Sequence, residues 1–404
     1  VYMTQNKWFT ITLIIVLSFA YFLHNYKVIP NPIALIFDSP TTNLSSDADK
    51  PGFVIGSNLQ RTSSVPNVTS QPIGQIIWSL GPGTLDGVSR PTIVDDIIYV
   101  GHRDWRVLSI DATSGDLLWE HKTNGFVNSS PSVAGDFVFV GSTDAFMRAF
   151  DRRSGSLLWK FKSNGPITSS PIIVNGFIFF GTHANLMYAL DAATGEELWT
   201  YDVGKAGGIY ASPSFHNGVL YFTTQDGSIH SVNHRTGQTK MKYRSRSLSA
   251  SHFPVIDNDL VYSLSGTRIL AIDAEMREIP ARWQFVRTWY ILYAHRWPVP
   301  PPPSQQGFKW WYSPDENSFF SAPPAVTSDG LYIGDSMGRL LARDPINPSK
   351  EIWTFQTTGQ ITTTPLVLGD VVYFGTKKGI IHALDRHSGD EIWNIDLESP
   401  ITLP

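Results

Sequence analysis

The feature that most constrains this 404-residue sequence is a pattern that recurs about every 40 residues. In seven copies a proline precedes an aromatic residue by eight positions: Pro91 and Tyr99, Pro131 and Phe139, Pro171 and Phe179, Pro213 and Tyr221, Pro254 and Tyr262, Pro324 and Tyr332, and Pro365 and Tyr373. In six of them an Asp or Asn follows the aromatic residue by twelve positions, as Asp111, Asp151, Asp191, Asn233, Asp344 and Asp385. Self-similarity at a fixed period of this length indicates a repeat architecture.

Each copy has room for four short strands. The copy at residues 171–200 contains runs of strand length, separated by turn residues such as Asn175-Gly176, at 172–174, 177–180, 186–190 and 196–200. A four-stranded sheet of this size has two apolar faces and cannot bury both of them alone. Successive copies are therefore expected to stack face to face around an axis, which predicts an all-β propeller.

A glycine and a tryptophan complete the pattern. Four copies have the two residues four positions apart: Gly115 and Trp119, Gly155 and Trp159, Gly195 and Trp199, and Gly389 and Trp393. Trp78 and Trp353 are predicted to have the same role, Met241 marks a weakened copy, and Trp283 is expected to end the fifth copy. Asp and Gly together favour a tight turn that fixes the register of the strands. The tryptophan is expected to pack between neighbouring sheets.

The segments DATSGDLLW, DRRSGSLLW, DAATGEELW and DRHSGDEIW resemble the tryptophan-docking motif of the pyrroloquinoline-quinone-type repeat. This repeat builds the β-propellers of quinoprotein dehydrogenases and of the outer-membrane-assembly lipoprotein BamB, a relative that performs no chemistry. The resemblance covers roughly residues 76–404 and implies that the docking residues are structural. Since the family contains both enzymes and binding proteins, the resemblance implies a fold rather than an activity.

The number of blades depends on what is counted. Docking strands number eight and complete copies number seven. Residues 76–78 resemble a last strand with no copy before it, and residues 399–404 resemble the opening of a further copy. We therefore expect an eight-bladed ring with an incomplete eighth blade, in which Trp78 lies on the outer strand and the C-terminal residues form the inner strand. A C-terminally truncated sequence would explain this pattern, and a seven-bladed ring closed by one spare strand is the alternative.

Residues 1–27 are expected to be an N-terminal signal anchor, because residues 8–23 are uncharged and apolar and follow Lys7. The alternatives are a cleaved signal peptide, with residues 18–20 as the cleavage site, and a buried helix. Residues 28–75 are rich in Ser, Thr, Asn and Pro and are expected to form a largely disordered linker before the propeller at 76–404. This organisation predicts a single-pass protein of the cell membrane with its propeller on the exported side, periplasmic or extracellular.

One interval departs from the period. The spacing between Pro254 and Pro324 is 70 residues, and the extra residues, about 283–321, include a proline run and many aromatic side chains. Such aromatic density beside Arg and Lys is typical of a surface that binds a partner or a membrane interface. The candidate partner surface comprises Trp289, Trp297, Trp310 and Trp311. The alternatives are a hairpin that caps the ring and buries its own aromatic residues, and a lid over a ligand.

The sequence offers few groups for catalysis. A net charge of −4 gives no sign of nucleic-acid binding, the absence of cysteine excludes disulfides and thiolate metal sites, and the histidines show no pair at metal-ligand spacing. Ser129-Ser130 and Ser169-Ser170 are expected near the central channel, without a His or Asp partner at any motif spacing. We predict no catalytic residue, no metal site and no cofactor, with pyrroloquinoline quinone and calcium disfavoured.

The function favoured by this pattern is a non-enzymatic protein-interaction scaffold of the cell envelope, with envelope proteins as partners and no nucleic acid. The alternatives are a quinone-dependent dehydrogenase and a propeller that binds a small ligand or sugar. A dehydrogenase would require a cluster of oxygen ligands for calcium, a catalytic Asp and flat aromatic packing for the quinone. The chain also lacks the cysteine that would carry a lipid anchor of the BamB type.

Overall fold

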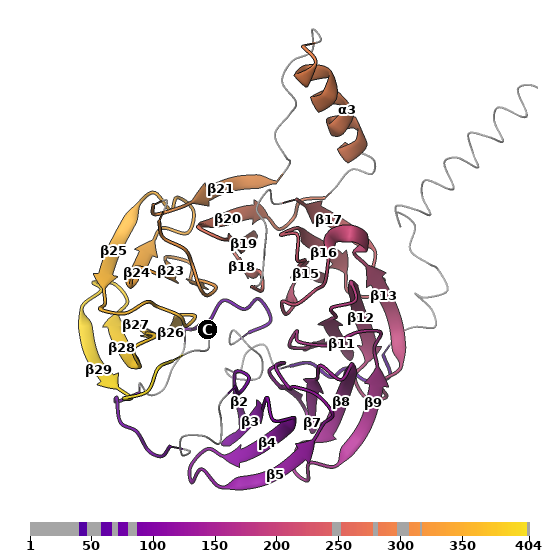
Figure 1. Cartoon of the computed structure of the whole chain (residues 1–404), viewed down its shortest axis with the longest axis vertical. Coiled ribbons are helices and arrows are strands. Elements are labelled where there is room, and N and C mark those ends of the chain that lie inside the picture. The colour runs from indigo at the N-terminus through magenta and orange to yellow at the C-terminus, as the bar shows by residue number, and fades with distance from the viewer. Residues whose placement is uncertain are drawn as a thin grey trace, which may run out of the picture.

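The computed structural model describes residues 40–46, 58–66, 72–79, 87–244, 252–277, 282–296, 307–315 and 317–401. These residues form seven antiparallel sheets arranged in a ring around a central channel (Figure 1). Each sheet takes four consecutive strands in chain order, with the first strand innermost and the last on the rim. We number the sheets blades one to seven. The predicted all-β propeller is confirmed.

The strands are short, as the repeat predicts. Blades one to three comprise β2 (Thr92–Val94), β3 (Ile97–Gly101), β4 (Arg106–Asp111) and β5 (Leu117–Lys122); β6 (Ser132–Ala134), β7 (Phe137–Gly141), β8 (Phe146–Asp151) and β9 (Leu157–Lys162); and β10 (Ile172–Val174), β11 (Phe177–Gly181), β12 (Leu186–Asp191) and β13 (Glu197–Asp202). A single 3₁₀ turn among the described residues, η1 (Gly204–Ala206), follows β13.

Blades four and five comprise β14 (Ser214–His216), β15 (Val219–Thr223), β16 (Ile229–Asn233) and β17 (Thr239–Tyr243), and β18 (Val255–Asp257), β19 (Leu260–Ser265), β20 (Arg268–Asp273) and β21 (Phe308–Tyr312). Blades six and seven comprise β22 (Ala325–Val326), β23 (Leu331–Gly334), β24 (Arg339–Arg343) and β25 (Glu351–Gln356), and β26 (Leu366–Leu368), β27 (Val371–Gly375), β28 (Ile380–Asp385) and β29 (Glu391–Asp396). The remaining elements are β1 (Ser64–Val65) and helix α3 (Arg282–Ala294).

The recurring residues mark the same places in every blade. Each of the seven prolines lies one residue before an innermost strand, where a residue without an N–H group costs the sheet no hydrogen bond. In blade three the Asn175-Gly176 turn has φ of 50° and 83°, the positive values that a two-residue hairpin requires. At the end of β4 the Asp111 carboxylate accepts hydrogen bonds from the N–H groups of Ser114 and Thr113, which hold its pKa below the usual range. These Asp residues therefore stabilise turns.

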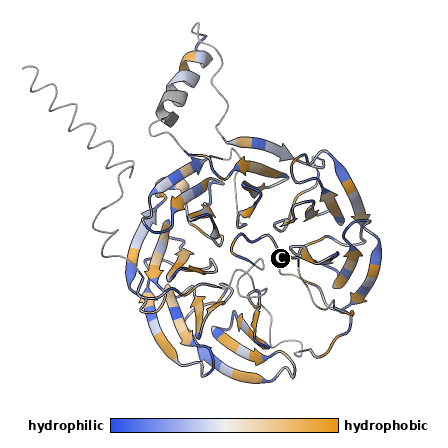
Figure 2. Ribbon diagram, turned by 180° about the vertical axis from the view of Figure 1, so that it is seen from behind, coloured by the Kyte–Doolittle hydropathy of each residue, from blue (hydrophilic) through white to orange (hydrophobic). Residues whose placement is uncertain are grey.

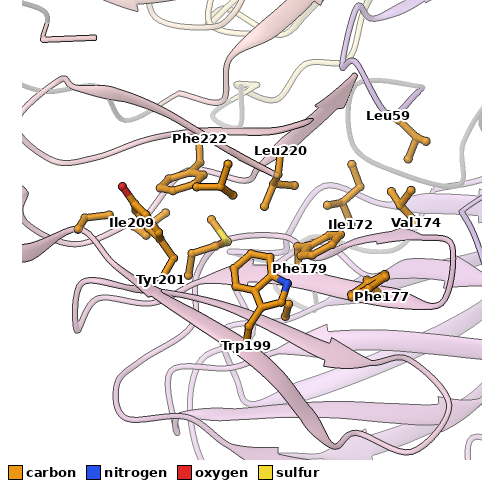
Figure 3. Close-up of a cluster of buried hydrophobic side chains, with 14 of the residues drawn as sticks. Leu59, Ile172, Val174, Phe177, Phe179, Trp199, Tyr201, Ile209, Leu220 and Phe222 are labelled. Atoms are coloured by element: carbon orange, nitrogen blue, oxygen red, sulfur yellow. The ribbon is translucent and has the colours of Figure 1, made fainter. Parts of the chain in front are cut away.

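The core lies between neighbouring blades. Between blades three and four, Phe179 and Trp199 pack with Leu220 and Phe222 (Figure 3). Every residue of β11 is buried, whereas β9 on the rim alternates between exposed and partly buried side chains. Figure 2 shows the same contrast, with hydrophobic inner strands and mixed outer strands. The rim is therefore the surface that each blade presents to solvent.

The segment that includes β1 lies against the inner strands of the ring. Backbone N–H groups from four blades donate to it in turn: Phe215 to the Leu59 carbonyl at 2.8 Å, Ile256 to Gln60 at 3.0 Å, Val326 to Thr62 at 2.9 Å and Val367 to Ser63 at 2.9 Å. β1 then pairs in parallel with β26 as a fifth strand of blade seven. Residues 28–75 were expected to be a largely disordered linker, but the parts that the structure describes contact the propeller, because their backbone groups complete the inner edges of its sheets.

Blade five differs from the prediction. Trp283 lies in α3 and does not end the fifth copy; the outer strand is β21, in which Trp310 pairs with Ala271. The insertion therefore lies between β20 and β21 and ends before residue 308, not at 321. The expected signal anchor at 1–27 and Trp297 lie outside the described residues. None of the helices in the described part of the chain is both long and apolar enough to cross a membrane.

Candidate interaction surface

Five of the docking tryptophans share one geometry. The indole Nε1–H donates to a backbone carbonyl in the turn of the next blade: Trp78 to Ala112 at 2.7 Å, Trp119 to Arg152 at 3.0 Å, Trp159 to Ala192 at 3.1 Å, Trp199 to His234 at 2.9 Å and Trp353 to Arg386 at 2.8 Å. Within its own blade each strand residue opposite the docking position is Ala or Ser, which leaves room for the ring. The indole thus joins two blades.

Where the turn contains a glycine, that glycine receives the indole of the preceding blade. Gly155 has φ of 70°, and a Cβ atom there would lie 2.6 Å from the ring of Trp119. Gly195 and Gly389 stand in the same relation to Trp159 and Trp353. Glycine is required twice over, by the positive φ and by the close approach of the indole. The spacing of Gly and Trp therefore reflects contacts between blades, not catalysis.

Two segments complete this pattern between blades seven and one. Gly74 has φ of 72° and lies under the indole of Trp393, while Trp78 packs against Gly115 of blade one. Residues 74 and 78 thus repeat the Gly-to-Trp spacing of a regular blade. At the other end, Ile401 lies against Gly375 as Ile167 lies against Gly141. Residues 74–78 therefore make the contacts that the outer strand of a regular blade makes, and Ile401 makes the contact of a residue that precedes an inner strand. Both sets of contacts lie between the seventh sheet and the first.

The serines near the channel also join blades. The Ser130 N–H donates to the Ser170 hydroxyl at 2.9 Å, and the Ser132 hydroxyl donates to the Pro171 carbonyl at 2.6 Å. Ser129 and Ser169 accept hydrogen bonds from the N–H groups of Gly141 and Gly181 at the ends of neighbouring strands. These hydroxyl groups hold the inner strands in place, and no His or Asp side chain contacts them within the described residues.

The described part of the channel contains two arginine side chains beside one aromatic ring. Arg61 and Arg90 both lie beside the ring of Phe253, with their guanidinium carbons 5.3 Å and 5.5 Å from the centre of that ring. Burial, with Arg90 nearby, lowers the pKa of Arg61 to about 9. Among the described residues no group of three His, Asp or Glu side chains is placed to hold a metal ion.

One rim position separates blade five from the others. The residue after the docking position faces outward, and in six blades it is polar: Glu120, Lys160, Thr200, Lys242, Thr354 and Asn394. In blade five it is Trp311, whose side chain is 52% exposed. Arg268 stacks on its ring, with the guanidinium carbon 4.4 Å from the ring centre. Sequence reasoning selected Trp311 but missed Arg268 and the exposed Phe308 at the start of β21.

The three described tryptophans of the candidate surface, Trp289, Trp310 and Trp311, lie in different surroundings. Trp310 is the docking residue of blade five, 5.8 Å from the ring of Tyr262, so it belongs to the core. Trp311 lies on the rim, and Trp289 lies in α3 outside the circle of sheets (Figure 1). Alternation along β21 sends neighbouring side chains to opposite faces, which separates Trp310 from Trp311. A register shift between Ala271 and Ile272 brings Phe308 to the same face of the sheet as Trp311. The surface is therefore Phe308 and Trp311 with Arg268, which we call the blade-five rim.

The comparisons with known proteins agree with this architecture. A family model described as outer membrane protein assembly factor BamB matches residues 61–280 and 296–403. The chain belongs to the BamB family. A curated BamB from Nitrosomonas eutropha (strain DSM 101675 / C91 / Nm57) is 30% identical over 81 residues, which is 20% of this chain and 19% of that protein. This relative shares only a short stretch with the chain.

Solved structures resemble the chain over most of its length. The crystal structure of BamB from Moraxella catarrhalis has a TM-score of 0.54 at 19% identity and covers 70% of this chain and 79% of that one. A quinohemoprotein alcohol dehydrogenase from Comamonas testosteroni has a TM-score of 0.69 at 15% identity, with 89% and 75% covered. At these identities the likeness is one of fold, which binding proteins and enzymes share.

Proposed function

We propose that this protein is a non-enzymatic, BamB-like interaction scaffold of the cell envelope, with residues 1–27 as its membrane anchor and the propeller on the exported side. Membership of the BamB family supports this proposal. The observation that carries it is Trp311, a large exposed aromatic side chain at a rim position that is polar in the other six sheets. Exposed Trp beside Arg is the composition of protein-interaction hot spots.

We also propose that the ring has eight positions, of which the eighth is formed around residues 72–79 and the residues near 401. The contacts of Gly74 with Trp393 and of Trp78 with Gly115 support this count. A seven-position ring would require blade seven to dock directly on blade one. A fluorescence measurement of distance between labels on β29 and β5 separates the two, since a missing position brings the two rims closer by the width of a blade.

Site-specific photocrosslinking tests the scaffold role. p-Benzoylphenylalanine placed at position 311 of the full chain, in envelope preparations, is expected to capture a discrete protein. The matched control is position 354, the equivalent exposed rim site on β25 of blade six. Equal crosslinking at the two positions, or none at 311, would refute the assignment of the blade-five rim.

The dehydrogenase alternative has a direct test. The purified full chain is incubated with pyrroloquinoline quinone and calcium, and the absorbance of the quinone is recorded together with reduction of a redox dye by alcohols or sugars. We expect no saturable binding, because the described residues lack a carboxylate cluster for the cation. Saturable binding with dye reduction would replace the scaffold with an enzyme.

A further inference from the structure

Helix α3 is an addition to the propeller. The BamB family model matches the chain on both sides of the helix but leaves out residues 281–295. Figure 1 shows α3 outside the circle of sheets, next to blade five. A segment that the family model lacks and that lies beyond the stacked blades is not needed to close the ring. Its role must come from its own chemistry.

Most of the described side chains of α3 are aromatic or aliphatic and exposed. Tyr290, Ile291 and Tyr293 are 55%, 47% and 45% exposed. Successive helical residues point about 100° apart, so these side chains lie on several sides of the helix. A helix that is apolar on several sides is normally buried, in a protein core or in a membrane. Because the propeller does not bury these side chains, we expect them to be covered by another apolar environment, such as a partner protein or a membrane.

The length of the helix limits what that environment can be. Thirteen residues give about 20 Å of helix at 1.5 Å per residue, short of the hydrocarbon thickness of a bilayer. Apolar stretches of this length are typical of interfacial or re-entrant segments. Tyr and Trp are the residues that favour the boundary between headgroups and acyl chains, because each combines an apolar ring with a polar atom. The composition of α3 fits a shallow position in a bilayer.

The charge of the residues around α3 indicates which kind of lipid the helix would bind. Residues 280–312 contain none of the 35 acidic residues of the chain and four basic ones. Lys309 is paired with Asp273 at 3.0 Å, so the positive charge offered to a membrane is that of Arg282, Arg287 and Arg296. The chain as a whole has a net charge of −4, so the positive charge is concentrated in this interval. Basic residues beside an interfacial helix are attracted to anionic lipid headgroups, whereas they gain little from a neutral surface.

We propose that α3 binds the surface of a membrane that contains anionic lipid, with its aromatic side chains inserted at the headgroup level. The contact is separate from the signal anchor and from the blade-five rim. Since α3 and β21 belong to the same blade, the bound helix holds the rim that carries Trp311 close to the bilayer. Blade five would then be the blade nearest the bilayer and the most accessible to other membrane proteins.

The test uses a local probe on the full chain, because residues 8–23 are apolar and would themselves bind vesicles. The chain has no cysteine, so Ile291→Cys gives a single attachment site for the environment-sensitive dye NBD. The control is Leu158→Cys on β9, where the side chain is 49% exposed on the rim of another blade. Vesicles contain phosphatidylcholine alone or with 30% phosphatidylglycerol, and some carry a spin-labelled lipid that quenches the dye.

With anionic vesicles, the dye at 291 is expected to shift to the blue and to be quenched by the spin-labelled lipid, while the dye at 158 stays in water. A second variant, Arg296→Gln on the same labelled chain, is expected to weaken partition of the helix about fivefold, as loss of one charge near an anionic surface predicts. Salt at high concentration should act in the same direction.

Three results would overturn the proposal. The dye at 291 would stay in water on both kinds of vesicle, or it would respond equally to neutral and anionic vesicles, or it would shift only when envelope proteins are added. The last result would assign α3 to a protein partner. Crosslinking at position 311 is read independently, so failure of the lipid contact and failure of the scaffold role are distinguishable.

Discussion

Blades three and five are built from the same repeat but close onto their neighbours differently. In blade three, Trp199 donates a hydrogen bond to the His234 carbonyl and packs on Gly237 of blade four. In blade five, Trp310 occupies the docking position, but its indole N–H is buried and has no hydrogen-bond partner within the described residues. The turn that should receive it, after Asp344, has no glycine. The fold thus tolerates a docking contact without its hydrogen bond and its glycine in the blade that carries the insertion.

This difference suggests that the docking contact has two separable parts. The apolar contact of the ring is kept in both blades, since Trp199 lies 5.7 Å from Phe179 and Trp310 lies 5.8 Å from Tyr262. Of these two blades, only blade three also has the hydrogen bond and the glycine. Packing therefore defines the blade, and the polar contact adds stability to the joint between blades.

The largest expected effect comes from removing the two rings. Trp199→Ala should lower the free energy of unfolding by about 3–5 kcal/mol, because it removes a large buried side chain. Trp310→Ala should cost roughly 1–2 kcal/mol less, since it removes a buried N–H group that has no acceptor. Urea unfolding followed by circular dichroism measures both. Equal losses would mean that the hydrogen bond of Trp199 adds nothing.

The glycines give the next effect. Gly195 and Gly266 both have positive φ, 76° and 62°, but a Cβ at 195 would lie 2.7 Å from the ring of Trp159, while at Gly266 of blade five it meets nothing within 4 Å. Replacement by Ala should cost about 1–2 kcal/mol at either site from backbone strain. Gly195→Ala should cost about 1–3 kcal/mol more from crowding. Thermal unfolding of the two variants, compared side by side, tests the contribution of the indole.

A pH dependence distinguishes blades four and five at one buried position. His230 in β16 corresponds to Leu270 in β20, and burial, followed by the charge of Lys242, lowers the pKa of His230 to about 3. The unfolded chain takes up a proton below about pH 6.5 and the folded chain does not, so stability falls as the pH drops from 6.5 towards 3. The slope from this residue is about 1.4 kcal/mol per pH unit.

His230→Leu, which copies blade five, should remove that slope and lower stability above pH 6.5 by about 1 kcal/mol, because it removes the hydrogen bond between the His230 ring and the Tyr201 hydroxyl. Urea midpoints at pH 4, 5, 6 and 7 measure it. A variant that keeps the full acid sensitivity would show that His230 is not its source. His387→Gln, at an exposed turn of blade seven, is the matched control.

The smallest effect concerns the surface of blade five. Arg268→Ala removes the stacking on Trp311 and should cost about 0.5–1 kcal/mol, the usual value of an exposed cation–π pair. Lys160→Ala on blade two, where the cation lies 5.5 Å from the Phe146 ring centre, should cost no more. Unfolding midpoints for both variants test this order. A large loss at Arg268 would mean that the pair supports the fold and is not mainly a surface feature.

The sequence predicts the blades well, because each strand is specified by local residues. The prolines, the aromatic residue eight positions later and the Asp turn all lie within one blade, so their spacing survives in the sequence. Trp283 was misassigned because the insertion breaks that spacing and supplies several tryptophans. Only the pairing of Trp310 with Ala271 across β20 identifies the true docking residue.

The candidate surface was predicted in part. Trp311 was selected for its aromatic surroundings, yet its meaning depends on alignment with the polar residue of every other blade. That comparison is available from the repeat once Trp310 is placed. Residues 58–66 could not be placed from the sequence, since they are held mainly by backbone hydrogen bonds to strands more than 150 residues away, and such bonds leave little trace in side-chain pattern.

The pairing of β1 with β26 sets an order on biosynthesis. Ser64 emerges from the ribosome about 300 residues before Val367, its partner in the sheet. Each intermediate blade can form as it is made, but the segment at the centre lacks its last neighbour until blade seven has been made. The ring is therefore closed late, and until then the nascent chain keeps an unpaired strand edge that other chains could join.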